Sequence, residues 1–278
     1  MPRPHAVLGA ALAGVAAVAG VALTPGPATG NDVPPDGEGT AGPPYDYETA
    51  LMGEYALIPL PDQAMITRTE HGYLFRAGQQ DTHLVVTLTG DGRLRFADSG
   101  TAEIKQLARG CRAEAVAQGV AAVCRVPQWV STAQPLLLEV WPRLGDDFVD
   151  GSSLPASYAM TVLSDAGHDT AFLGAGPDFF NGFTGRDRVR GGAGNDWIRT
   201  GDGADVVWGG AGDDQLVGTD GADRFYGEDG DDRLGGGAGN DRLDGGGGAD
   251  RVLCEAGADV VRTDGIDRLS ACESVTHG

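Results

Sequence analysis

The most regular feature of the chain is a nine-residue pattern of apolar and polar positions that runs from residue 164 to residue 262. In eleven successive nine-residue units, from SDAGHDTAF to CEAGADVVR, the fourth position is glycine, the sixth is aspartate and the eighth is apolar. A twelfth unit, TDGIDRLS, is one residue shorter and keeps Gly265, Asp267 and Leu269. A fixed period held in phase indicates a repeat architecture, so we expect stacked units here and not a disordered glycine-rich tail.

Each nine divides into a six-residue turn and a three-residue strand. Glycines at positions one, two and four tolerate positive φ and let the chain curl. In the strand, the side chain at position eight points to one face and its two neighbours to the other. One inward residue per strand makes a core only if two strands face each other in each turn. The pattern therefore predicts a parallel β-roll with 18 residues per turn, about 5.5 turns and about 25 Å long.

The turns also predict a metal. Main-chain carbonyls that curl inward and the carboxylate at position six supply hard oxygen ligands, which calcium prefers. Transition metals favour imidazole or thiolate ligands, which the repeated pattern does not provide. Calcium is therefore the expected ion.

These residues resemble the haemolysin-type calcium-binding repeats, also called RTX repeats, whose nonapeptide reads G-G-x-G-x-D-x-(apolar)-x. The resemblance implies several calcium ions, each between turns two repeats apart and held by the position-six aspartates of both turns. One flank would use Asp169, Asp187, Asp205, Asp223, Asp241 and Asp259. The other would use Asp178, Asp196, Asp214, Asp232, Asp250 and Asp267. The implied carbonyl ligands lie around Gly192, Gly194, Gly210, Gly212, Gly237 and Gly239.

The turns do not all match equally well. Both leading glycines occur only in the units that start at 191, 209, 236 and 245. The units at 191 and 209 are neighbours on one flank, so the best single site pairs Asp196 with Asp214. The units at 164, 173 and 254 lack one or both leading glycines. In the unit at 182, Phe183 stands where the second glycine is expected. We expect little metal at those ends, where a solenoid needs atypical capping repeats.

The net charge of the chain and its N-terminal segment fit an exported protein. The chain has 40 acidic and 20 basic residues, a net charge of −20. Without cations the stacked carboxylates repel one another, so we expect the repeats to fold only with calcium. The charge also argues against nucleic acid and anionic membranes as partners. The N-terminal segment predicts a signal peptide at residues 1–28, because Arg3 is followed by the apolar run 6–23 and two prolines. A retained membrane anchor is the alternative. We therefore expect a secreted protein with no membrane span after cleavage, with association to the cell surface as the alternative.

Four cysteines in an exported chain suggest disulfides, with three possible connectivities. Cys111 and Cys124 are close enough in sequence to close a short loop. Cys254 and Cys272 are 18 residues apart, one turn of the roll, where stacked residues lie near enough for a disulfide. We predict these two pairs, with four reduced thiols as the alternative.

The rest of the chain favours an all-β protein. Residues 29–44 are a Pro- and Gly-rich linker and residues 45–135 a small β-rich domain, with a hairpin turn at Gly90–Gly92. Residues 101–126 could hold a short helix, or a cysteine-pinned loop that ends in the strand AAVCRV. LLLEVW, GDDFVD and MTVLSD form irregular capping turns at 136–163, followed by the roll at 164–270 and a tail at 271–278. The order Gly-Cys, Val-Cys, strand and LGDDFVD resembles exported calcium-binding repeat proteins of actinobacteria.

No catalytic motif accompanies the repeats. The sequence has no HExxH, no G-x-S-x-G and no P-loop. We interpret His71 and His83 as turn and strand residues, the Asp146–Asp147 pair as part of a turn, and Ser152 and Ser153 as loop residues. We therefore expect no enzyme; the alternative is a secreted hydrolase with an unrecognised active site.

An outward row of side chains leaves a second alternative open. Arginine recurs at position seven, and three aromatic side chains also face outward: Arg188, Arg224, Arg233, Arg242, Arg251, Arg268, Trp197, Trp208 and Tyr226. These are either solvated ladders that soften the negative charge or a face for a cell-wall polymer, a glycan or an extracellular protein. The second interpretation would make the protein a calcium-dependent adhesin or a surface-structural protein.

Overall fold

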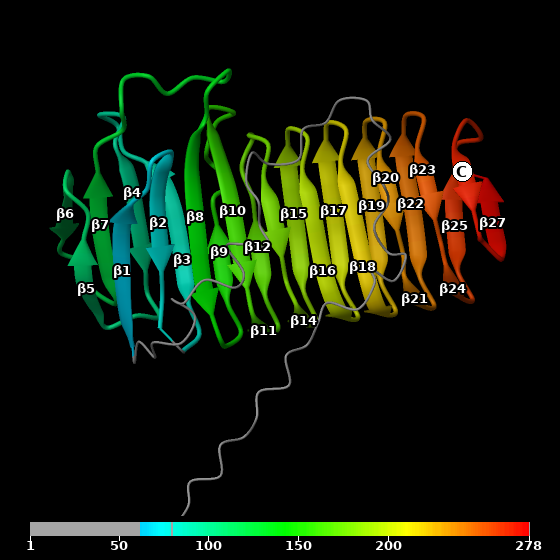
Figure 1. Cartoon of the computed structure of the whole chain (residues 1–278), viewed down its shortest axis with the longest axis horizontal. Helices are drawn as coiled ribbons and strands as arrows, with labels where there is room; N and C mark the ends of the chain where they lie inside the picture. The colour runs from blue at the N-terminus through cyan, green and yellow to red at the C-terminus, as the bar shows by residue number, and fades with distance from the viewer. Residues whose placement is uncertain (1–61, 79, 278) are drawn as a thin grey trace, which may run out of the picture. The chain divides into compact units, whose positions relative to one another are not determined.

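The computed structural model describes residues 62–78 and 80–277 (Figure 1). These residues form strands and turns without a helix, so none of them forms a helix able to span a membrane. The all-β prediction is confirmed. The expected signal peptide at 1–28, the linker at 29–44 and residues 45–61 of the β-rich domain lie outside the described residues.

The strands build two sheets, which we call sheet A and sheet B. Sheet A has 15 strands. Along its main path it contains β26 (Arg268–Ser270), β23 (Arg251–Leu253), β20 (Arg233–Gly235), β18 (Gln215–Gly221), β16 (Trp197–Gly203), β13 (Phe179–Asn181), β10 (Tyr158–Ser164), β8 (Leu136–Arg143), β2 (Gly72–Arg76), β1 (Gln63–Arg68) and β5 (Glu103–Leu107). Four two-residue strands join it at the turns: β11 (Ala166–Gly167), β14 (Thr184–Gly185), β21 (Ala238–Gly239) and β24 (Ala256–Gly257).

Sheet B has 12 strands and runs beside sheet A through the whole described part of the chain. In order it contains β27 (Ser274–His277), β25 (Val260–Thr263), β22 (Arg242–Gly247), β19 (Arg224–Asp229), β17 (Val206–Ala211), β15 (Arg188–Ala193), β12 (Thr170–Phe172), β9 (Phe148–Asp150), β3 (His83–Leu88), β4 (Leu94–Asp98), β7 (Val120–Cys124) and β6 (Cys111–Glu114). Successive repeats alternate between the two sheets, as Figure 1 shows for β15 to β18.

The repeats pair in parallel and in register, each with the unit two repeats further on. Val189 lies opposite Val207, and Ile198 lies opposite Leu216, 18 residues away in both cases. All eleven position-eight side chains, from Ala171 to Val261, are at most 2 % exposed. The predicted β-roll of 18 residues per turn is therefore confirmed, and its inward apolar column forms a continuous core.

The two sheets do not end where the repeats begin. Strand β8 pairs in parallel with both β2 and β10, and β9 pairs in parallel with both β3 and β12. Antiparallel pairs then extend the sheets: β1 with β2, β3 with β4, and β7 with both β4 and β6. The expected hairpin is present, since β3 and β4 join around Gly92, which has a φ of 73°. Residues 62–143 are therefore built directly onto the first turns of the roll.

A helix within residues 101–126, one of the two sequence alternatives, is wrong. The segment forms β5, β6 and β7. Four of the five residues of β7 are buried, and the strand pairs on both sides, with β4 and β6. Sheet pairing and burial thus outweigh the helix propensity of this alanine-containing stretch.

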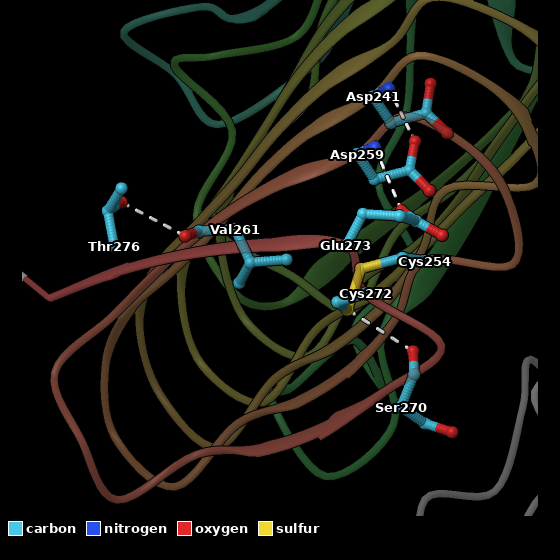
Figure 2. Close-up of a disulfide and its surroundings, with 8 residues drawn as sticks. All are labelled: Asp241, Cys254, Asp259, Val261, Ser270, Cys272, Glu273 and Thr276. Atoms are coloured by element: carbon cyan, nitrogen blue, oxygen red, sulfur yellow. Dashed lines mark hydrogen bonds between the residues drawn. A yellow bond between two sulfur atoms is a disulfide. The ribbon is translucent and has the colours of Figure 1, made fainter.

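Both predicted disulfide bonds are present. Cys111 and Cys124 face each other across β6 and β7, with Cα atoms 4.0 Å apart. Cys254 and Cys272 join the last two turns of sheet A, with Cα atoms 5.1 Å apart (Figure 2). The second bridge holds the segment 271–277, where β27 adds a further parallel strand to β25.

Candidate metal centre

The turns of the roll need glycine for two separate reasons. At position two the backbone is left-handed, with φ of 106° at Gly192 and 119° at Gly210. At position one the space above the Cα atom is already filled. A Cβ atom at Gly191 would meet the Asp196 carboxylate and the carbonyl oxygen of Gly209. The same turn therefore brings a carboxylate oxygen and a carbonyl oxygen of the next turn to one place.

The position-six aspartates of sheet B form a ladder along the roll. Each carboxylate Oδ1 accepts a hydrogen bond from the main-chain N–H of the aspartate one turn earlier, for example Asp187 Oδ1 from Asp169 N at 3.0 Å. The ladder runs through Asp147, Asp169, Asp187, Asp205, Asp223, Asp241 and Asp259.

A second ladder of the same kind follows sheet A. Asp214 Oδ1 accepts from Asp196 N at 2.8 Å, which brings together the pair that we expected to be the best site. The ladder runs through Asp178, Asp196, Asp214, Asp232, Asp250 and Asp267. The two ladders are the two flanks that the resemblance implied.

The second carboxylate oxygen is buried without a partner in almost every rung. Oδ2 has no hydrogen bond in the structure at Asp147, Asp169, Asp187, Asp196, Asp205, Asp214, Asp223, Asp232, Asp241, Asp250, Asp259 and Asp267. The ladder aspartates from Asp147 to Asp259 are each at most 3 % exposed. Asp178 is the exception, because its Oδ1 accepts from Met160 N and its Oδ2 from Gly174 N at 2.7 Å. A row of buried acceptors without donors is costly unless a cation or a proton occupies it.

Burial and neighbouring carboxylates shift the acidity of these groups. Desolvation is the largest cause, followed at several rungs by repulsion between turns, and it raises the pKa of Asp187 and Asp232 to about 8. Burial likewise raises the pKa of Asp214 to about 7 and that of Asp250 to about 6. The pKa of Asp196 is raised well above its usual value by burial and by the carboxylates of Asp178 and Asp214. The ladders are therefore reluctant to carry bare negative charge near neutral pH.

The donor set suits calcium. No three His, Cys, Asp or Glu side chains gather at one point in residues 62–78 and 80–277, so an ion held in a turn needs main-chain carbonyls beside the carboxylates. The position-one carbonyls, such as that of Gly209 beside Asp196, are in place for this. Carboxylate and carbonyl oxygens are the ligands of a hard cation such as calcium. The orphaned Oδ2 atoms and these carbonyls thus fit the ion that the resemblance implies.

The carbonyls expected from the sequence also lie against the next turn. Those of Gly192 and Gly194 face the Cα atoms of Gly210 and Gly212 in the next turn.

The structure also adds two ladder residues that the nonapeptide does not contain. Asp147 begins the sheet B ladder, with its Oδ1 accepting from Thr82 N at 2.6 Å. Glu273 ends it, with its Oε2 accepting from Asp259 N at 3.0 Å, and Figure 2 shows its carboxylate beside those of Asp259 and Asp241. The Gly-Asp-Asp order of GDDFVD signals the first residue, but nothing in the sequence signals the second, because the step from Asp259 to Glu273 is 14 residues and not 18.

Residues considered for catalysis are engaged in the fold. The imidazole of His83 stacks on Phe148, with ring centroids 4.3 Å apart. Asp146 accepts from His168 N at 2.8 Å, whereas Asp147 belongs to the buried ladder. The Ser152 hydroxyl donates to Asp150 Oδ1 at 2.7 Å. Each contact accounts for its residue structurally.

Together, the parallel roll and its carboxylate ladders define a β-roll of the calcium-binding kind. Comparison with protein families agrees with this class. The family model for the RTX calcium-binding nonapeptide repeat (4 copies) matches five overlapping segments, 163–198, 181–216, 208–243, 217–252 and 226–261, so this part of the chain is similar to RTX repeats. A comparison with curated proteins finds no match.

Proposed function

We propose that the roll binds several calcium ions through the position-six aspartates and the turn carbonyls, and that this binding drives its folding outside the cell. The observation that carries the proposal is the pair of buried carboxylate ladders in which Oδ2 has no partner. The proposed ligands are the aspartates of both ladders. Asp178 is the weakest candidate, because both of its oxygens already accept main-chain hydrogen bonds.

The chain itself provides the coupling between binding and folding. Residues 164–262 contain 20 acidic and 9 basic residues. The roll stacks the position-six carboxylates in two rows, with one carboxylate of each row per turn. Burying an unpaired charge costs several kcal/mol, so the apo roll must either keep protons on its ladders or open. Bound calcium supplies the positive charge that these oxygens lack, and its binding free energy becomes folding free energy.

We also propose that the protein is exported. The expected signal peptide and the two disulfide bonds fit an oxidising compartment. Extracellular calcium modules bind at about 0.1 to 1 mM, so such sites stay empty in the cytosol and fill after export. The chain would then cross the membrane unfolded and fold on the far side.

A calcium titration tests the proposal. We expect far-ultraviolet circular dichroism of the mature chain to gain β signal cooperatively as calcium rises from chelator to 10 mM (about ten times the upper end of that range). Calorimetry should show uptake of more than one ion. Magnesium is the matched control, because it demands a small octahedral cage and keeps its waters. An unchanged spectrum with no calcium uptake would reject the proposal.

A further inference from the structure

Charge in the roll is sorted by structural element. Of the nine basic residues in 164–262, eight stand at outward strand positions seven or nine, and only Arg186 lies in a turn. Of the twenty acidic residues, nineteen lie at positions one to six of the nonapeptide, and only Asp244 stands at one of the outward strand positions seven and nine. The turn edges of the roll are therefore acidic, and its two sheet faces are basic.

The outer face of sheet B is the more open of the two faces. Five exposed arginines project from β15, β19, β22 and β25: Arg188, Arg190, Arg224, Arg242 and Arg262. On sheet A, by contrast, the outward positions of Val217 and Gly235 are buried. A ligand that follows the long axis of the roll thus has free access to sheet B.

Only one of the five arginines of sheet B, Arg262, has an acidic partner within the described residues. Arg224 and Arg242 lie directly opposite each other in register on adjacent strands, an arrangement in which like charges repel. Neither forms an ion pair within the described residues. The one acid of this face, Asp244, is bonded to Arg262 at 2.8 Å. The repulsion between unpaired guanidinium groups would be relieved by an anionic ligand.

A row of flat side chains runs beside this arginine column. The guanidinium of Arg190 lies 4.8 Å from the centroid of the Trp208 ring, and Tyr226 stacks on the same ring at 5.8 Å with an interplanar angle of 12°. Both faces of Trp208 are therefore taken by its neighbours along the roll. Only the ring edges remain for a ligand. These edges carry the N–H of Trp208 and the O–H of Tyr226, which can hydrogen-bond to it.

We propose that this face, formed by β15, β17, β19, β22 and β25, binds an extended anionic polysaccharide of the uronate type. The arginines hold its carboxylates, and the edges of Trp208 and Tyr226 bond its hydroxyl groups. A charge-assisted bond from a guanidinium to a carboxylate is among the stronger polar contacts. The inference rests on the proposed function, because the face is assembled only when the roll is folded.

Other polyanions fit this face less well. Single-stranded nucleic acid is bound through bases stacked on open aromatic faces, and the faces of Trp208 are closed. A membrane surface favours several apolar side chains that insert beside the basic ones, whereas in the described part of this face Val260, at 39 %, is the only large apolar side chain that is exposed. A stiff polymer with a regular row of carboxylates and many hydroxyls matches both columns and loses little conformational entropy on binding.

Hyaluronan fragments are a suitable probe, since they carry uronate carboxylates and remain soluble with calcium. We expect the mature chain in saturating calcium to bind them, to ignore neutral dextran, and to lose affinity as salt rises. The double variant Arg224→Gln/Arg242→Gln should bind about tenfold more weakly or worse. The matched control Arg199→Gln/Arg268→Gln removes the same charge from sheet A and should bind like the wild type.

Circular dichroism of each variant in calcium separates the possible failures. A normal β signal with no hyaluronan binding overturns the surface proposal alone, whereas a missing β signal overturns the proposed function. Equal binding by the two double variants would assign the contact to calcium bridging at the turns and overturn the role of the arginines. Tighter binding to vesicles with anionic phospholipid, or to single-stranded DNA, would overturn the choice of ligand.

Discussion

Residues 62–143 and the RTX roll share the same two sheets but are stabilised in different ways. The first region buries large side chains, such as Tyr73, Phe75 and Phe96, each at most 1 % exposed. The rings of Phe75 and Phe96 stack with centroids 6.2 Å apart. The repeated pattern of the roll buries the apolar residue at position eight of each nine and, with it, the carboxylate at position six. One half of the fold thus depends on apolar burial, and the other on the neutralisation of buried charge.

This difference explains how a roll that folds with calcium, as we propose, can begin folding in the right register. Strands β8 and β9 are paired on one side with β2 and β3 and on the other with the first strands of the roll. A region that folds by apolar burial offers two preformed edges on which the first turns can be laid. We therefore expect the first region to retain its structure when the roll loses its own.

Calcium removal should give the largest effect. In chelator, hydrogen exchange should become fast across residues 188–253, because the ladders have lost their cation, and should stay slow in β2, β3, β4 and β8. Mass spectrometry of exchanged peptides measures both regions in one sample. Uniform loss of protection across the chain would show that the two regions form one cooperative unit and would break the comparison.

Acidification should partly replace calcium. The pKa values of Asp187 and Asp232 are raised to about 8 by burial, and those of Asp214 and Asp223 to about 7. Between about pH 4 and these values the folded roll holds protons that the unfolded chain has released, so its stability falls as pH rises.

The calcium-free protein should therefore melt at a higher temperature at pH 5 than at pH 8. With saturating calcium the two melting temperatures should come closer together, since the cation takes the place of the proton. Scanning calorimetry in metal-stripped buffer measures both. A calcium-free protein that is more stable at pH 8 would contradict the interpretation of the ladders.

Phe96→Ala should separate the two regions by stability. The side chain is 1 % exposed and packs on Phe75 and Tyr73, so its removal should cost about 3 to 5 kcal/mol. The calcium midpoint of the roll should stay near that of the wild type if the first region remains folded. Phe183→Ala is the matched control, because Phe183 is 42 % exposed. Denaturant titration with and without calcium gives both quantities.

Asp214→Asn should change the roll alone and have the smallest effect. The amide oxygen can still accept from Asp196 N, but the charge at Oδ2 is lost, so the calcium midpoint should rise about tenfold. Asp213→Asn is the control at the preceding residue, since Asp213 is exposed and its carboxylate accepts a hydrogen bond from the main-chain N–H of Asp231. Equal midpoints for the two variants would show that the buried ladder does not hold the ion.

Much of the roll could be predicted because its geometry is local and repeated. A nine-residue period places every position-eight residue inward and every position-six carboxylate in one of two rows, whatever the neighbouring residues are. The same arithmetic places Cys254 one turn from Cys272, and the disulfide is present. The helix alternative within 101–126 was wrong because no repeated pattern indicates the structure of that segment. Its strand β7 pairs with β4, which is distant in sequence, and with β6, which lies across a turn.

The sequence by itself determined the period, the two rows of aspartates, the inward apolar column and the candidate ion. Only the tertiary structure decided that Oδ2 has no hydrogen bond at every ladder aspartate except Asp178, that Glu273 ends the ladder, and that four of the five arginines of sheet B form no ion pair within the described residues. The physical reason is that a period fixes directions along one strand, whereas hydrogen-bond partners and charge neighbours depend on what lies one turn away. Those contacts come from the stacking of turns and the pairing of distant strands, which no single repeat encodes.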